Sequence, residues 1–275
     1  MILNKKTNLN NFSKDKITVL NVEENLTGTD WAVGDLHGNH SLLKKGLELI
    51  NFDFSKDRLF CTGDLIDRGK EPVDCLNLLK EPWFYSVLGN HELFLIDAAQ
   101  ANFMSREAKD WIMEDGSWTK NQSHEELTKM AQLAVQLPFI ITVGKDQKFH
   151  IVHAEILTQE DVGINDDYVA SLHNRVDDWL AADLVWGRKI AYYPHLAKDA
   201  QSPNLSPVYC GHTIVDYPQV IGRQAFLDKM AWIDNGGICL CNTQTNEYFE
   251  LRNNGTKIKG EMVWDNYSSS KRVRF

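Results

Sequence analysis

The chain has 275 residues, of which 43% are hydrophobic and 24% are charged, and its formal net charge is −9 at pH 7. Average globular proteins have this composition, so a disordered chain is excluded, and the negative charge disfavours nucleic acid as the main partner because phosphate binding requires a basic surface. The length suits one large α/β domain or two small ones.

Residues 1–29 are polar and weakly patterned, and we expect an N-terminal extension or an edge strand there. From Asp30 onwards, short apolar runs alternate with segments whose leucines recur at helical spacing. The strands are predicted at 30–35, 58–64 and 83–90, and the helices at about 42–50, 72–79 and 91–99. This alternation predicts βαβ units and a sheet covered by helices.

The rest of the chain predicts one helical region, one irregular region and more strands. Residues 102–136 should be helical with a break at Asp115-Gly116, and residues 156–205 should be the least regular part. The further strands are predicted at 139–143, 148–155, 208–213, 230–236 and, as a pair, within 238–251. We expect a single domain over 30–264 and a frayed tail over 265–275.

The sequence gives no sign of secretion or of a membrane span. Its apolar runs are much shorter than the roughly 20 residues that cross a bilayer, and residues 1–10 lack an apolar signal core. The five cysteines include no CxxC pair, which argues against a disulfide framework or a thiolate zinc site. We therefore expect a cytoplasmic protein without a membrane partner.

Polar side chains gather where the predicted strands end, which is where open α/β sheets bind ligands. They are Asp35, His37, Asp64, Asn90, His153 and His212. Their oxygen and imidazole donors suit Mn²⁺, iron or Zn²⁺ rather than Ca²⁺. Asp64 is placed to bridge two ions, and such a pair clamps a phosphoryl oxygen and lowers the pKa of a shared water. Glycines beside the ligands, such as Gly63 and Gly211, should let the backbone turn sharply.

Five motifs in chain order resemble the phosphoprotein phosphatase family of metal-dependent serine/threonine phosphatases, and above all its bacteriophage lambda-type and bacterial branch. They are GDLHG, GDLIDRG, GNHE, HAE and GHT, and the likeness covers about residues 30–250. The resemblance implies a calcineurin-like metallophosphatase fold of the α/β (α+β) class, with a central β-sandwich of mixed sheets flanked by helices. It also implies hydrolysis of phosphoserine and phosphothreonine monoesters, with phosphotyrosine left open, by direct attack of a hydroxide held by two divalent metal ions.

The resemblance further assigns the metal ligands. Asp35, His37 and Asp64 would hold the first ion, and the second would lie on Asp64, Asn90, His153 and His212. Asn90 is also expected to contact the substrate. Mn²⁺ is the expected metal, with iron or zinc as alternatives.

The same resemblance assigns the acid and the phosphate-binding arginines. His91 would be the general acid, oriented and kept charged by Asp67. Arg68 would bind phosphate oxygens, and the second arginine would be Arg188 in VWGRK, with Arg175 as its competitor.

Some residues are given no catalytic role. Glu155 stands where relatives often have Asp or Gly, and the stretch 156–187 is longer than in compact phage relatives, which leaves the substrate groove undefined. Several tryptophans are interpreted as core or cap packing rather than as a base-stacking platform. They are Trp111, Trp118, Trp179, Trp186 and Trp232.

Two other functions compete with a phosphoprotein phosphatase. A symmetrical diadenosine tetraphosphate hydrolase has the same fold, but that subfamily usually has alanine in place of Asp67, GNHD in place of GNHE and GHW in place of GHT. A scaffold without metals would lack a ligand, and none is missing here. The expected partners are therefore phosphorylated proteins or peptides, without an obligatory regulatory subunit.

Overall fold

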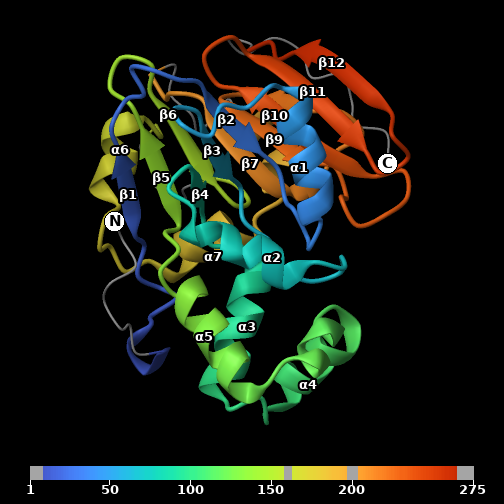
Figure 1. The fold of residues 1–275 in the computed structure, drawn as a ribbon. Coiled ribbons are helices and arrows are strands. Elements are labelled where there is room, and N and C mark those ends of the chain that lie inside the picture. Colours follow the sequence, from blue (N-terminus) through green and yellow to red (C-terminus); the bar gives the residue numbers. More distant parts are fainter. Residues whose placement is uncertain (1–8, 158–162, 197–203, 265–275) are drawn as a thin grey trace.

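A computed structural model describes residues 9–157, 163–196 and 204–264 of the chain. Within these ranges, two mixed sheets of six strands each lie against one another, with helices on the outside (Figure 1). The expected β-sandwich flanked by helices is therefore confirmed. None of the helices in the described ranges has the length and hydrophobicity that crossing a bilayer requires. The tail expected at 265–275 lies outside the described residues.

The first sheet has the strand order β1-β5-β6-β7-β9-β8. Its strands are β1 (Val19–Val22), β5 (Ile140–Val143), β6 (Phe149–Val152), β7 (Val208–Ile214), β8 (Gln219–Ile221) and β9 (Gln224–Asp228). β1 pairs with β5 at one edge, and β6, β7 and β9 are parallel neighbours. The carboxyl ends of β6 and β7 therefore point to the same edge of the sheet.

The second sheet has the strand order β12-β11-β10-β2-β3-β4. Its strands are β2 (Asp30–Val33), β3 (Arg58–Cys61), β4 (Phe84–Ser86), β10 (Gly237–Asn242), β11 (Glu247–Arg252) and β12 (Lys257–Glu261). β2, β3 and β4 are parallel, as the three predicted strand–helix pairs require, while β10, β11 and β12 are antiparallel. The carboxyl ends of β2, β3 and β4 thus form one edge as well.

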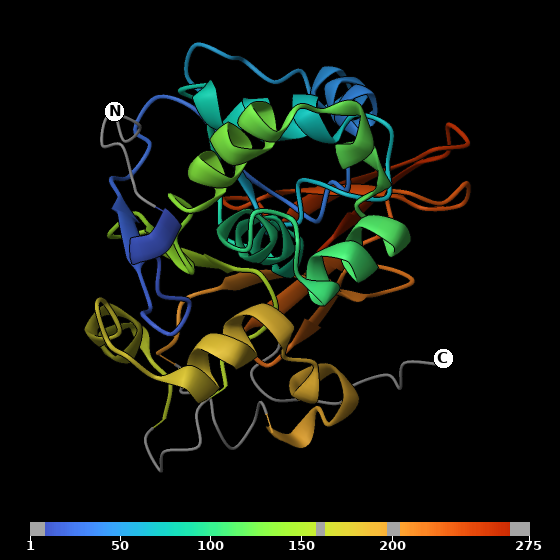
Figure 2. The same ribbon diagram turned by 90° about the horizontal axis from the view of Figure 1, so that it is seen from below.

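Eight α-helices and three 3₁₀ turns lie within the described ranges. The helices are α1 (His40–Leu49), α2 (Pro72–Asn77), α3 (Asn90–Gln100), α4 (Arg106–Glu114), α5 (His124–Ala134), α6 (Asp166–Ser171), α7 (Asp178–Trp186) and α8 (Lys189–Tyr192). The turns are Leu9–Asn11, Leu78–Lys80 and Ser117–Asn121. Seen from below, α3 lies near the centre of the molecule, with α5 on one side of it and α7 on the other (Figure 2).

One sequence prediction was wrong, and another needs more detail. The stretch expected to be the least regular contains three short helices, α6, α7 and α8, because Asn165 and Asp177 act as helix N-caps that accept hydrogen bonds from backbone N–H groups. Residues 230–236 form a loop rather than a strand, and the strand is β9, just before it. Met230 has a left-handed φ of 50°, and Asn253 Nδ2 donates to carbonyl groups of this loop that a neighbouring strand would otherwise use.

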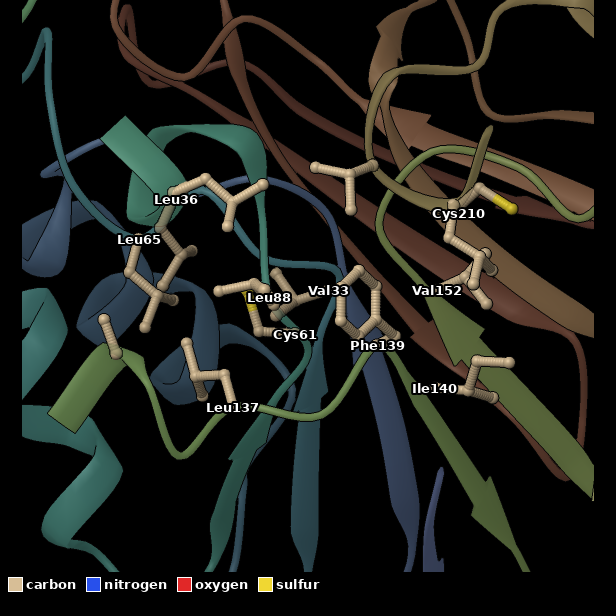
Figure 3. Packing of buried hydrophobic residues seen from close by; sticks show 14 of the residues in the cluster. Val33, Leu36, Cys61, Leu65, Leu88, Leu137, Phe139, Ile140, Val152 and Cys210 are labelled. Atoms are coloured by element: carbon tan, nitrogen blue, oxygen red, sulfur yellow. The ribbon is translucent and has the colours of Figure 1, made fainter. Parts of the chain in front are cut away.

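Buried leucines anchor the loops that leave the parallel strands. Leu36, Leu65 and Leu88 follow β2, β3 and β4, and each is fully buried in the same cluster (Figure 3). A second cluster joins the two sheets, where Phe60 of β3 meets Phe149 of β6 with ring centroids 5.5 Å apart. The loops at the sheet edge are thus held by the core, which fixes the polar residues beside each leucine.

Candidate metal centre

The predicted ligands lie at or near the carboxyl ends of five strands. Asp35 follows β2, Asp64 follows β3, and Asn90 opens α3 after β4. His153 follows β6 directly, and His212 lies within β7 where its pairing with β9 shifts register. All five side chains are buried. Residues up to 177 positions apart in the sequence therefore share one site.

Several residues at this edge have left-handed backbone conformations, which side chains other than glycine rarely adopt. They are His37 (φ 42°), Asp64 (φ 48°), Asp67 (φ 73°), Arg68 (φ 64°) and His212 (φ 57°). Conformations of this kind cost free energy and persist only where the surrounding structure enforces them. Here backbone N–H groups of the first loop donate to the second, with His37 N 2.8 Å from Asp64 O. The surrounding structure therefore holds these strained conformations, and all of these side chains except that of Arg68 are buried.

The glycines beside the ligands serve two different purposes. Gly63 has a φ of 100°, so it provides the sharp turn that we expected. Gly211 is not among the residues with positive φ, and a Cβ at this position would overlap Asp35 Oδ1 and Thr62 Oγ1. The expectation was therefore right for Gly63, but Gly211 is needed because the carboxylate approaches its backbone.

Hydrogen bonds to backbone carbonyls fix the tautomers of two imidazoles. The Nδ1 atom of His37 lies 3.0 Å from Ile66 O, and that of His153 lies 2.7 Å from Thr62 O. A carbonyl can only accept, so each Nδ1 carries the proton and each Nε2 keeps its lone pair. Burial lowers the pKa of His37 to about 3, and burial is also the largest cause that lowers the pKa of His212 to about 2. These neutral rings are in the form that binds metal.

The Nε2 atoms of His153 and His37 lie close to oxygen atoms that are also hydrogen-bond acceptors. His153 Nε2 lies 2.9 Å from Asn90 Oδ1 and 3.5 Å from Asp64 Oδ1, while His37 Nε2 lies 3.5 Å from Asp64 Oδ2. The Nε2 atom of His212 is buried without a hydrogen-bond partner in the described ranges. Acceptors facing one another without a proton between them are stabilised by a cation. The donor set therefore fits divalent metal ions. Asp64 Oδ2 faces His37, and Asp64 Oδ1 faces His153.

Buried negative charge strengthens this fit. Asp35 accepts from Thr62 Oγ1 and from the backbone N–H of His212, both at 2.7 Å. Burial and the charges of Asp228 and Asp64 raise the pKa of Asp35 well above its usual value. Asp228 was not among the predicted site residues, and its pKa is raised to about 6, chiefly by burial. Three carboxylates buried close together are stabilised when a positive charge lies between them.

His91 is held by Asp67 through a bond of 2.6 Å between Nδ1 and Oδ2. Two indole N–H groups donate to the same carboxylate, from Trp111 at 2.7 Å and from Trp118 at 2.6 Å. Our interpretation of these tryptophans as packing residues missed this role. Although burial lowers it, the charge of Asp64, the hydrogen bond that His91 donates to Asp67 and the charge of Asp67 raise the pKa of His91 above its usual value. The charged form of the imidazole, which these groups favour, is the form that can act as an acid.

Glu92, the last residue of GNHE, was given no role from the sequence. Its buried carboxylate accepts from the backbone N–H groups of Asp64 and Leu65 at 2.9 Å, Gly89 at 3.1 Å and Ile66 at 3.3 Å. It therefore ties the loop after β4 to the loop after β3. A carboxylate that binds several backbone donors fixes the ligands beside them without contacting the metal.

Arg68 lies at the edge of the centre between three partners. Its Nε donates to Asp115 Oδ1 at 3.2 Å, and its guanidinium lies 4.3 Å from the centroid of the Trp232 ring. Its Nη1 donates to His37 Nε2 at 3.0 Å. That nitrogen has a single lone pair, so a metal ion on His37 would release the guanidinium for other anions.

The two candidates for the second arginine have different partners in the structure. Arg188 Nη2 donates to the carbonyl oxygen of His212 at 3.3 Å, and its charge contributes to the low pKa values of His153 and His212. Arg175 forms an ion pair of 3.0 Å with Asp177 at the start of α7. Of the two, Arg188 is the one brought to the candidate metal centre.

The chain resembles known proteins in sequence and fold. A family model described as calcineurin-like phosphoesterase matches residues 31–216. The chain is 33% identical to serine/threonine-protein phosphatase 2 of Salmonella typhimurium, over 77% of the chain and 89% of that protein. A segment of 24% of the chain is 48% identical to a symmetrical bis(5'-nucleosyl)-tetraphosphatase of Actinobacillus succinogenes, covering 25% of that protein. A solved serine/threonine phosphatase from Saccharomyces cerevisiae has the same fold, with a TM-score of 0.56 and 14% identity over 83% of this chain and 78% of that one.

Proposed function

Because the chain belongs to the calcineurin-like phosphoesterase family, we propose that it hydrolyses phosphoserine and phosphothreonine monoesters of proteins or peptides. The observation that carries this proposal is the bond between His91 and Asp67. A serine or threonine alkoxide is a poor leaving group and must be protonated as it departs. A buried imidazole that a carboxylate favours in its charged form meets that need.

The metal assignment is part of the proposal. Asp35, His37 and Asp64 would hold one ion, and the other would be held by Asp64, Asn90, His153 and His212. When bound, the ions supply Lewis-acid activation of a phosphoryl oxygen and of water. We propose Mn²⁺ because the donors are oxygen and imidazole nitrogen, without a thiolate.

The other steps belong to the chain's own side chains. Arg68 and Arg188 bind the equatorial oxygens of the phosphoryl group, where a planar guanidinium fits two oxygens at once. His91 gives its proton to the leaving oxygen from Nε2, since its Nδ1 is bonded to Asp67. Asp67 keeps the ring in place, and the two indole donors keep Asp67 in place.

Diadenosine tetraphosphate is the competing substrate, since a quarter of the chain resembles a symmetrical bis(5'-nucleosyl)-tetraphosphatase. Cleavage of a phosphoanhydride releases a nucleotide phosphate, which leaves readily without a proton. The pair formed by His91 and Asp67 would therefore contribute little to that reaction, so its presence favours an alkyl phosphate substrate.

A substrate panel tests the proposal directly. The protein, reconstituted with Mn²⁺ in a reducing buffer that matches the expected cytoplasmic location, is given phosphoserine, phosphothreonine and phosphotyrosine peptides and diadenosine tetraphosphate. No regulatory subunit is added, since none is expected. We expect the phosphoserine and phosphothreonine peptides to have the highest kcat/KM. Faster hydrolysis of diadenosine tetraphosphate would contradict the proposal.

Arg188→Ala should reduce kcat by about 10²–10³, because this is the usual cost of losing one group that stabilises developing charge. Arg175→Ala is the matched control, because Arg175 is paired with Asp177 at the start of α7. It should stay near the wild-type rate on the same phosphopeptide. A large loss in Arg175→Ala with none in Arg188→Ala would show that the two roles are reversed.

A further inference from the structure

Glu155 is fully buried just after the carboxyl end of β6, two residues after His153, and no catalytic role was expected for it. Its Oε1 accepts from the backbone N–H of Lys189 at 2.9 Å, and its Oε2 accepts from that of Ile190 at 2.8 Å. These two N–H groups open α8 and directly follow Arg188. The carboxylate therefore holds the backbone on one side of the arginine.

Asp183 of α7 holds the residues on both sides of Arg188. Gly187 N donates to Asp183 O at 3.0 Å, and Lys189 Nζ binds both carboxylate oxygens of Asp183 at 2.7 and 2.8 Å. A Cβ on Gly187 would overlap Glu155 Cγ, although the φ of Gly187, −64°, is ordinary for any residue. Glycine is thus required because Glu155 packs against it, not because of the turn itself.

A direct covalent link joins this arrangement to the metal centre. His153 and Glu155 are separated only by Ala154, whose backbone N–H donates to Leu184 O of α7 at 2.8 Å. The same short segment therefore presents a candidate metal ligand on one side and anchors the turn that carries Arg188 on the other. Without these contacts, the long exposed side chain of Arg188 would have no fixed position relative to the ions.

We propose that Glu155 is a positioning residue that fixes the turn 187–190 so that Arg188 is aimed at the phosphoryl group. The inference rests on the proposed role of Arg188 in phosphate binding. Charged groups accelerate a reaction most when they are already in place before it starts, and a displacement of about 1 Å can cost about 10²-fold in rate. Glu155 provides that placement without touching the substrate.

Removing the carboxylate should weaken phosphate binding and leave the metals in place. Glu155→Ala leaves the two N–H groups of α8 without their acceptor, so kcat/KM for p-nitrophenyl phosphate should fall by about 10–10². The inhibition constant of inorganic phosphate should rise by about tenfold, because Arg188 would no longer be held in position. Glu155→Gln retains one acceptor oxygen and should recover part of both losses. Metal content, measured by atomic emission, should equal that of the wild type in both variants.

A double-mutant cycle with Arg188→Ala separates positioning from general destabilisation. If Glu155 acts through Arg188, Glu155→Ala should have little further effect in the Arg188→Ala background. Asp166→Asn is the matched control, because Asp166 also accepts from a backbone N–H, that of Ser206 at 2.8 Å, at the start of α6. It should leave kcat/KM and the phosphate inhibition constant unchanged even if it lowers Tm.

Three results would overturn the inference. The first is that the losses of kcat/KM in Glu155→Ala and Arg188→Ala multiply in the double variant. The second is that Glu155→Gln loses metal. The third is that Arg188→Ala leaves the inhibition constant of phosphate unchanged. The cycle uses p-nitrophenyl phosphate, so it can be interpreted whichever natural ester is preferred. A preference for diadenosine tetraphosphate in the substrate panel would overturn the proposed function and leave the coupling between Glu155 and Arg188 measurable.

Discussion

Dialysis against EDTA should abolish hydrolysis of p-nitrophenyl phosphate, and added Mn²⁺ should restore it. The centre offers neutral imidazoles and buried carboxylates, but the cysteines in the described ranges are all free and none is among its donors. Metal held by oxygen and nitrogen alone exchanges with a chelator. The measurement is the rate before chelation, after it, and during titration with Mn²⁺, Fe²⁺ or Zn²⁺. Full activity in protein shown to be free of metal would overturn the assignment of the centre.

Stability should follow the same metal. Burial, and after it the charges of Asp228 and Asp64, raises the pKa of Asp35, while burial and the charge of Asp64 raise that of Asp228. An ion that binds only the folded chain stabilises it by about 2.7 kcal/mol at a hundred times its Kd. Tm should therefore rise with added Mn²⁺ in a concentration-dependent way. A Tm that is insensitive to Mn²⁺ while activity responds would place the ion on the substrate rather than in this centre.

The parallel half of the fold could be predicted because each of its strands ends in the same kind of local signal. Asp35, Asp64 and Asn90 each follow a short apolar run and a glycine, and the helices that return the chain have clear apolar faces. The edge of the first sheet was harder. Nothing in residues 230–236 indicated that Met230 would adopt a left-handed φ, and an apolar run followed by a glycine suits a loop as well as a strand.

The metal ligands could be predicted more fully than the residues that hold them. Trp111 and Trp118 donate to Asp67 across 44 and 51 positions of sequence, and this depends on how α4 packs against the loop after β3. Their one local signal is their position on either side of the break at Asp115-Gly116. Glu155 lies beside a predicted ligand, yet its partners are backbone N–H groups, which carry no sequence signature. Supporting contacts of this kind become visible only when the elements are assembled.

His91→Asn should separate the acid from the metal ligands. His91 Nε2 lies 3.9 Å from Asp64 Oδ2, so it is near enough to the centre that both roles must be tested. As a general acid it contributes about 10²–10⁴-fold, and the need for it falls as the leaving group becomes more acidic. The variant should therefore keep its metals, lose most of its rate on a phosphoserine peptide and lose much less on p-nitrophenyl phosphate. His153→Asn is the contrasting variant, which should lose metal and slow both substrates together.

The support of His91 gives the same experiment a second readout. Asp67→Asn removes the negative charge and weakens the hydrogen bond that together raise the pKa of His91, so that pKa should fall. His91 must be protonated to act, so the alkaline limb of the pH–rate profile should move to lower pH, and the phosphoserine peptide should suffer more than p-nitrophenyl phosphate. Trp118→Phe removes one donor that holds Asp67 in place, and it should slow the phosphoserine peptide less than Asp67→Asn does, without moving the alkaline limb to lower pH. If His91→Asn slows both substrates equally, or loses a metal ion, the assignment of His91 as the general acid is wrong.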